Sequence, residues 1–245
     1  MTSMDEIDKK TCISCDFKQS EKYCPNCGEI SIRRKITFEA VLGESFSTFL
    51  NMDKGYLYNL RGLTFSPQSF IEDYLSGKRR GIFNPISYLV ISISLYLILE
   101  NIFPVAETPV STETIKDTTI FKVGYEAGTI ITDYFKFFWF VSIFLLALPS
   151  AFIYGKKNYA EHVTIASFII GHATLLVAFL TPLINVPLIF NYVLYTLILI
   201  LYYRFYSNPN DKFGSFIISF LVVLIFFVEL FLFTILLGAI SYFLF

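Results

Sequence analysis

Charged residues are scarce in this sequence, and their scarcity excludes an ordinary soluble domain. Of the 245 residues, only 16% are Asp, Glu, Lys or Arg, against about 25% in soluble globular domains. The charges are also segregated, because residues 1–84 hold 12 of the 19 Lys and Arg and 11 of the 20 acids. The composition therefore predicts a polar N-terminal part followed by a membrane-embedded remainder.

Histidine is nearly absent, and two histidines do not supply a His-rich catalytic metal site. The sequence also lacks H-E-x-x-H, G-x-S-x-G and a phosphate-binding glycine loop. Paired acids at catalytic spacing are missing from the apolar segments. These absences lean against an enzyme without deciding the question.

No cysteine follows residue 27, and no apolar leader of secretory length occurs in the first thirty residues. We therefore expect a reducing compartment and no disulfide framework. Two C-x-x-C pairs lie in "CISCDFKQSEKYCPNCGE" with eight residues between them. Four thiolates at this spacing predict a closed, structural zinc site. The expected ligands are Cys12, Cys15, Cys24 and Cys27.

Two alternatives to zinc are weighed for the same four sulfurs. A redox dithiol usually lies in a βαβ context, which the sequence does not show. Iron binds an identical ligand set. We expect residues 12–30 to form a zinc-ribbon-like knuckle, in which Pro25 and Gly28 favour a tight turn, and residues 1–11 to be disordered.

Five apolar stretches approach or exceed the roughly 20 residues that span a bilayer as a helix. They are residues 84–103, 134–154, 159–184, 187–206 and 213–245. The last is longer than a bilayer core, so it must tilt, break near Gly238 or protrude. The predicted fold is an all-α membrane protein: a five-span bundle over residues 84–245, preceded by the four-cysteine knuckle and amphipathic helices.

Loop charges predict the orientation of the five spans. The segments before the first span, between the second and third, and between the fourth and fifth carry Lys and Arg. The loop 104–133 has two Lys and five acids, and the loop after the third span is uncharged. Positive charge marks the cytoplasmic side. We expect a multi-pass protein of the bacterial inner membrane, with a cytoplasmic N-terminus and a periplasmic C-terminus.

Residues 36–80 are too polar to span but carry apolar residues at helical spacing. Ser66, Pro67 and Gly77 predict the start and the end of one helix. One interpretation places amphipathic helices on the cytoplasmic leaflet, with Lys78, Arg79 and Arg80 among the lipid headgroups. The other is a small helical domain packed on the ends of the spans.

Ionisable residues inside apolar helices are candidates for function. His172 is central in the third predicted span and Glu229 in the fifth, so the two side chains could meet at the midplane. Glu161 and His162 begin the third span, and Glu161 shares a helical face with His172. The functional interpretation is a polar path into the membrane. The structural alternatives are an interhelical hydrogen bond and a first-turn acid that stabilises the helix.

The order of these motifs resembles a known family. "YCPNCGE", "SPQSFIEDYLSGKRRGIFNP" and "YAEH" are similar to the uncharacterised bacterial inner-membrane family called domain of unknown function 3667. The similarity covers the first ninety residues well and extends to Tyr159–His162. It implies the architecture and a zinc knuckle, and it carries no catalytic residue.

The leading functional hypothesis is a non-enzymatic scaffold, assembly factor or accessory subunit. Its expected partners are membrane lipids and another membrane protein or a second copy, with no nucleic acid. A small transporter or lipid-handling protein with a polar site between the third and fifth spans is the first alternative. A membrane enzyme acting on a lipid-linked substrate is the second.

Overall fold

The computed structural model describes residues 10–12, 14–19, 23–28, 55–103, 123–124, 128, 139–184, 186 and 188–244. The chain divides into two compact units, Met1–Ser87 and Tyr88–Phe245. Most of the described residues are helical, and three helices are long and apolar enough to cross a membrane. The predicted helical class is therefore confirmed, and the three long apolar helices are compatible with the predicted membrane protein.

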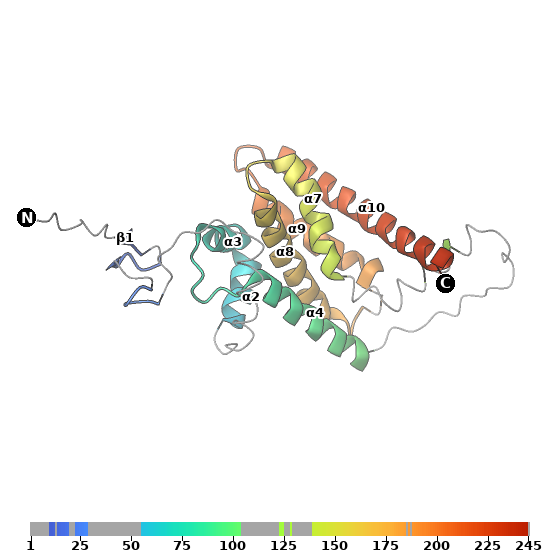
Figure 1. Ribbon diagram of the computed structural model, residues 1–245, viewed down its shortest axis with the longest axis horizontal. Helices are drawn as coiled ribbons and strands as arrows, with labels where there is room; N and C mark the ends of the chain where they lie inside the picture. The colour runs from blue at the N-terminus through green and yellow to red at the C-terminus, as the bar shows by residue number, and fades with distance from the viewer. Residues whose placement is uncertain are drawn as a thin grey trace, which may run out of the picture. The chain divides into compact units, whose positions relative to one another are not determined.

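The first unit begins with a very short antiparallel hairpin. Strand β1 (Lys10–Thr11) pairs with β2 (Lys18–Gln19), so that Lys10 lies opposite Gln19 and Thr11 opposite Lys18. β1 occupies the last two residues of the segment expected to be disordered, while residues 1–9 lie outside the described part. The hairpin closes the loop that carries the first cysteine pair (Figure 1).

A pair of helices completes the described part of this unit. Helix α2 (Tyr56–Phe65) is followed directly by α3 (Pro67–Ser76), which begins with proline at its first position and ends at Gly77 with φ 102°. These are the predicted boundaries of α3. The buried Phe70 ring lies against Gly62, where an added Cβ would be 2.2 Å from Phe70 Cδ2. Glycine therefore lets α3 pack closely on α2.

The second unit is a helical bundle. Helix α4 (Pro85–Ile102) begins at the end of the first unit and continues into the second. It is followed by the 3₁₀ turn η1 (Trp139–Val141), α7 (Ser142–Tyr154), α8 (Tyr159–Leu180), the turn η2 (Leu188–Phe190), α9 (Tyr192–Tyr206) and α10 (Lys212–Leu244).

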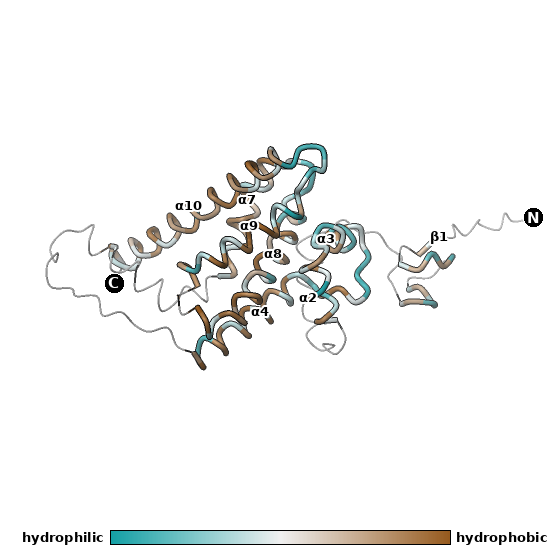
Figure 2. Tube along the Cα trace, turned by 180° about the vertical axis from the view of Figure 1, so that it is seen from behind, coloured by the Kyte–Doolittle hydropathy of each residue, from teal (hydrophilic) through white to brown (hydrophobic). Residues whose placement is uncertain are grey.

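Helix α8 lies between its neighbours, packing against both α7 and α9, and α10 packs against the same two helices (Figure 1). The most apolar 18-residue stretch of α8 is 83% buried, whereas that of α10 is only 28% buried. Brown, apolar residues nevertheless run along α10 in Figure 2. A helix that exposes so much apolar surface is suited to lipid and not to water.

Two of the five predicted spans are shorter in the structure than a full membrane crossing. The apolar helical stretches Trp139–Tyr154 and Tyr192–Tyr206 fall below the spanning length, and residues 134–138 of the second prediction lie outside the described part. By contrast, α10 is one helix through Gly238. Of the three alternatives for this long run, the break near Gly238 does not occur, which leaves tilt or protrusion.

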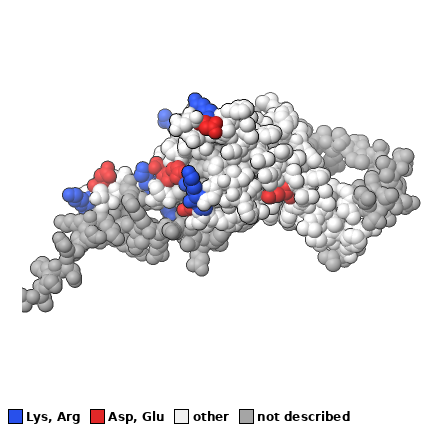
Figure 3. Space-filling model, turned by 90° about the horizontal axis from the view of Figure 1, so that it is seen from above, with Lys and Arg blue, Asp and Glu red and all other residues white. Residues whose placement is uncertain are grey.

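Charged side chains are few on the described surface of the molecule. On the face shown in Figure 3 they form small groups separated by wide uncharged areas. The loops 155–158 and 207–211, which join α7 to α8 and α9 to α10, lie at the same end of the bundle (Figure 1). This end carries four of the basic residues that the sequence predicts on the cytoplasmic side, namely Lys156, Lys157, Arg204 and Lys212.

Candidate functional site

The four cysteines form one compact cluster in the first unit. Their Sγ atoms all lie within 4.8 Å of one another, and none is in a disulfide. Cys12 Sγ is 3.5 Å from Cys27 Sγ, and Cys15 Sγ is 3.6 Å from Cys24 Sγ. Zn–S distances of about 2.3 Å in a tetrahedron require sulfur separations of about 3.8 Å. The cluster therefore has the size needed to hold a metal ion.

Two tight turns position the sulfurs. In the first, the Asp16 amide donates to the Cys12 carbonyl at 2.9 Å and the Cys12 amide donates to the Phe17 carbonyl at 2.9 Å. In the second, the Gly28 amide donates to the Cys24 carbonyl at 2.7 Å, and Gly28 adopts φ 75°. A positive φ favours glycine at this position, as the sequence predicts.

The chemistry of the donor set agrees with a structural metal. A hydrogen bond from the Phe17 backbone lowers the pKa of the Cys15 thiol to about 6, which favours the thiolate that binds metals. Cys12, Cys24 and Cys27 are buried. Four sulfur ligands leave no open position for substrate on a four-coordinate ion. The site can hold zinc or iron, and a bound ion would stabilise a segment with little other core.

His172 lies where α4 and α8 cross. Its Nδ1 is 2.8 Å from the Tyr88 hydroxyl, and both side chains are fully buried. The adjacent Gly171 makes the crossing possible, because a Cβ there would lie 3.1 Å from the Leu89 Cα. His172 therefore joins two helices through a hydrogen bond.

Glu229 does not bond to His172. It is half-buried on α10, which packs against α7 and α9, and its Oε2 has no hydrogen-bond partner in the described part of the chain. The two residues are central in their helices, as predicted, but His172 is occupied by Tyr88 of α4. Position along the chain indicates the depth of each residue but not the direction in which each helix face points.

Glu161 forms part of a helix cap. Its Oε2 accepts from the Asn158 amide at 2.8 Å, while its own amide donates to Asn158 Oδ1 at 2.9 Å. This reciprocal capping box satisfies two backbone donors at the start of α8. The structural interpretation of Glu161 accounts for its position.

His162 belongs to a polar aromatic cluster at the basic end of the bundle. Its Nδ1 lies 3.0 Å from the Tyr206 hydroxyl, and Tyr154 stacks on Tyr206 with ring centroids 4.0 Å apart. Tyr202 donates to Ser150 Oγ at 2.7 Å. The cluster ties together α7, α8 and α9.

Two buried atoms of this cluster, His162 Nε2 and the Tyr154 hydroxyl oxygen, have no hydrogen-bond partner among the described residues. Sequence reasoning found His162 but missed the tyrosines and Ser150. Tyrosines are so frequent in this chain that composition alone gives no signal for them.

The basic residues before α4 are partly engaged within the first unit. Lys78 Nζ lies 2.9 Å from Asp73 Oδ1, and this pair raises the pKa of Lys78. The Arg79 guanidinium lies 5.3 Å from the Tyr74 ring centroid, a cation–π contact. Arg80 is exposed.

Asn59 of α2 is a structural residue that sequence reasoning missed. Its Nδ2 donates to the Gly81 carbonyl at 3.0 Å and to the Gly55 carbonyl, and its Oδ1 accepts from the Phe83 amide at 2.9 Å. The side chain is fully buried. It fixes α2 against the segment that leads into α4.

One family model matches the chain. Residues 53–97 match the family described as "Protein of unknown function (DUF3667)". The matched segment contains α2, α3, the basic residues 78–80 and most of α4, and it begins well after the cysteine cluster. No curated protein and no solved structure gives a significant match.

Proposed function

We propose that this chain, matched over residues 53–97 by a family of unknown function, is a non-enzymatic integral membrane protein. It acts as a scaffold, assembly factor or accessory subunit and carries a structural zinc knuckle. The observation that carries the proposal is the cluster of four sulfur ligands, because a closed shell of four thiolates stabilises a fold and leaves no position for substrate.

The packing of α8 supports five spans in the proposed bundle. Helices α7 and α9 cover α8, and each exposes large apolar residues on its other side, such as Phe152 and Ile200. If α8 crosses the membrane, the helices that cover it lie in the membrane as well. They cross it as short, apolar helices beside α4, α8 and α10.

The loop charges support the proposed orientation. Lys156 and Lys157 lie in one of the two loops at the basic end, and Arg204 and Lys212 flank the other. By the positive-inside rule this end faces the cytoplasm of a bacterial inner membrane. The N-terminal knuckle and residues 36–80 are then cytoplasmic, where thiols stay reduced, and the C-terminus is periplasmic.

Elemental analysis of the purified full chain tests the metal assignment. We expect about one zinc per chain, and the substitution Cys24→Ser to remove most of it. Ser14→Ala, in the same segment, is the matched control and should retain zinc. Iron in place of zinc, or a metal-free wild-type chain, contradicts the assignment.

The scaffold role predicts a stable partner. Crosslinking in native membranes followed by mild purification is expected to recover either another membrane protein or a second copy of this chain. Recovery of a monomer without a partner contradicts this role. Zinc loss in Cys24→Ser should also lower partner recovery if the knuckle is part of the docking surface.

A lipid-handling or transport function is the second candidate. It is favoured by polar atoms inside the bundle that lack hydrogen-bond partners among the described residues, such as His162 Nε2 and Glu229 Oε2. A ligand would supply such partners. This candidate predicts that His162→Gln impairs function without lowering the amount of folded protein.

A further inference from the structure

Helix α2 buries one side and exposes large apolar side chains on the other. Asn59 and Leu63 are buried. On the opposite side, residues four apart along the helix form an exposed stripe: Leu57 is 76% exposed, Arg61 is exposed and Phe65 is 70% exposed. Large apolar side chains in such a stripe are unfavourable in water.

The neighbouring helix has the opposite character. The exposed stripe of α3, also with residues four apart, is formed by Gln68, Glu72 and Ser76. Helices α2 and α3 pack against each other, yet their exposed faces differ in polarity. The outer face of α3 suits water, and that of α2 suits an apolar medium.

The hydrogen bonds of Asn59 indicate which apolar medium the exposed face of α2 meets. Asn59 hydrogen-bonds the backbone of Gly81 and Phe83, and α4 begins at Pro85. Helix α2 is therefore held directly beside the start of the first helix long enough to cross a membrane. The backbone that Asn59 holds is thus only a few residues from the first residue of α4.

The charge on the stripe agrees with a lipid surface. Arg61 lies between Leu57 and Phe65 along the stripe and has no ion pair among the described residues, whereas Lys78 is paired with Asp73. A long basic side chain flanked by apolar ones places its stem among acyl chains and its guanidinium at the phosphate groups. Tyr58, 54% exposed at the edge of the stripe, suits the same interface.

We propose that α2 lies in the plane of the membrane surface. Leu57 and Phe65 enter the boundary between headgroups and acyl chains, and Arg61 binds the phosphate of an anionic phospholipid. The inference deepens the proposed function, since it rests on α4 crossing the membrane. It also assigns lipid contact to one face of α2. This is more specific than the sequence-based prediction, which places only the basic residues 78–80 among the lipid headgroups.

Tryptophan quenching by brominated lipid tests this placement in the full-length chain. Leu57→Trp and Phe65→Trp are compared with Gln68→Trp on α3, with the wild-type chain and its Trp139 as baseline. The vesicles contain phosphatidylcholine and phosphatidylglycerol, with bromine near the top of the acyl chains. We expect at least about twofold quenching of the new signal at positions 57 and 65 and little at position 68.

A second pair of variants tests the role of Arg61. In the Phe65→Trp background, Arg61→Glu should reduce the quenching in vesicles that contain phosphatidylglycerol, while Gln68→Glu should leave it unchanged. Equal quenching with and without phosphatidylglycerol would overturn the anionic-lipid part of the inference.

The variant Ile98→Trp tests whether α4 enters the bilayer, separately from whether α2 contacts lipid. Ile98 is 57% exposed on α4, so this tryptophan reports whether α4 enters the bilayer. Quenching at position 98 without quenching at 57 and 65 overturns the inference about α2 alone. No quenching at position 98 overturns the membrane-spanning proposal itself. Equal quenching at position 68 contradicts the assignment to one face.

Discussion

At the scale of single residues, Asn59 is the side chain whose loss has the clearest predicted cost. The substitution Asn59→Ala leaves the Gly81 carbonyl and the Phe83 amide without their partner. Water can reach the exposed Gly81, whereas the Phe83 amide is buried, and an unsatisfied buried group costs about 1–3 kcal/mol. We expect α2 and residues 81–83 to lose roughly 1–3 kcal/mol of protection in hydrogen exchange of the full chain.

Two comparisons sharpen this measurement. Asn59→Asp keeps an acceptor for the Phe83 amide but loses the donor to Gly81, so it should also destabilise the junction. The exposed Gln68→Ala should leave exchange unchanged. If Asn59→Ala leaves the hydrogen-exchange protection of residues 81–83 unchanged, the Asn59 hydrogen bonds contribute little to the stability of this junction.

Residues whose chemistry is local could be predicted from the sequence, whereas residues with distant partners could not. The cysteine cluster follows from two pairs close together in the chain. Asn59 bonds residues 22 and 24 positions away, and His172 bonds one 84 positions away. No spacing rule covers such distances or tells how the helices face each other, which is why the sequence does not reveal that His172 pairs with Tyr88.

At the scale of elements, the contact between Gly62 and Phe70 governs how α2 and α3 pack. In Gly62→Ala, the new Cβ would overlap the buried Phe70 ring. Overpacking of this kind typically costs about 1–3 kcal/mol. We expect faster hydrogen exchange in both helices of the full chain.

A double-mutant cycle with Phe70→Leu provides the control. The smaller side chain makes room for the added methyl group, so the double variant should be less destabilised than the sum of the two single variants. Strict additivity would contradict a direct clash between residues 62 and 70.

Helix boundaries were predictable where capping residues mark them, and lengths were not. Pro67 and Gly77 delimit α3 as expected, and Asn158 with Glu161 caps α8. In contrast, the apolar run 187–206 is predicted as one span, but α9 begins only at Tyr192, after the 3₁₀ turn η2. Hydropathy cannot distinguish a helix from an apolar turn that packs beside it.

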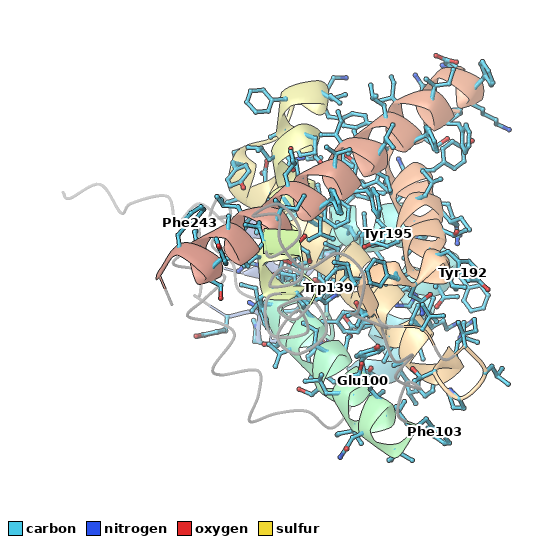
Figure 4. The ribbon with its side chains drawn as sticks, turned by 90° about the vertical axis from the view of Figure 1, so that its right-hand side faces the viewer. Glu100, Phe103, Trp139, Tyr192, Tyr195 and Phe243 are labelled. Carbon is cyan, nitrogen blue, oxygen red and sulfur yellow. The ribbon has the colours of Figure 1, made fainter. Side chains whose placement is uncertain are left out.

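Figure 4 shows Tyr195 and Trp139 directed toward neighbouring helices of the bundle.

At the scale of the whole molecule, the two short basic loops predict topology. Alkaline phosphatase fused after Lys157 or after Asn210 should be inactive, because that enzyme needs disulfides that do not form in the cytoplasm. A fusion after Thr181 should be active. Activity of the two basic-loop fusions would reverse the proposed orientation, and opposite results for them would contradict the antiparallel arrangement of α8 and α9.

Membrane class and charge distribution were visible in the sequence because they are sums over many residues. The packing order was not, since α7, α8, α9 and α10 are similarly apolar. Burial separates them: α8 carries Gly171, Ala173 and Thr174 and lies inside, whereas α10 exposes large residues such as Phe220 and Phe231. Small residues allow helices to approach closely in a membrane.

The length of α10 has a consequence for the surrounding bilayer. Its 33 residues extend about 50 Å, against about 30 Å for the hydrocarbon core. On the proposal that α10 crosses the membrane, its length without a break at Gly238 gives a hydrophobic mismatch that tilt relieves only in part. The protein should accordingly favour thicker bilayers, and lipid acyl-chain length becomes a variable that tunes its stability.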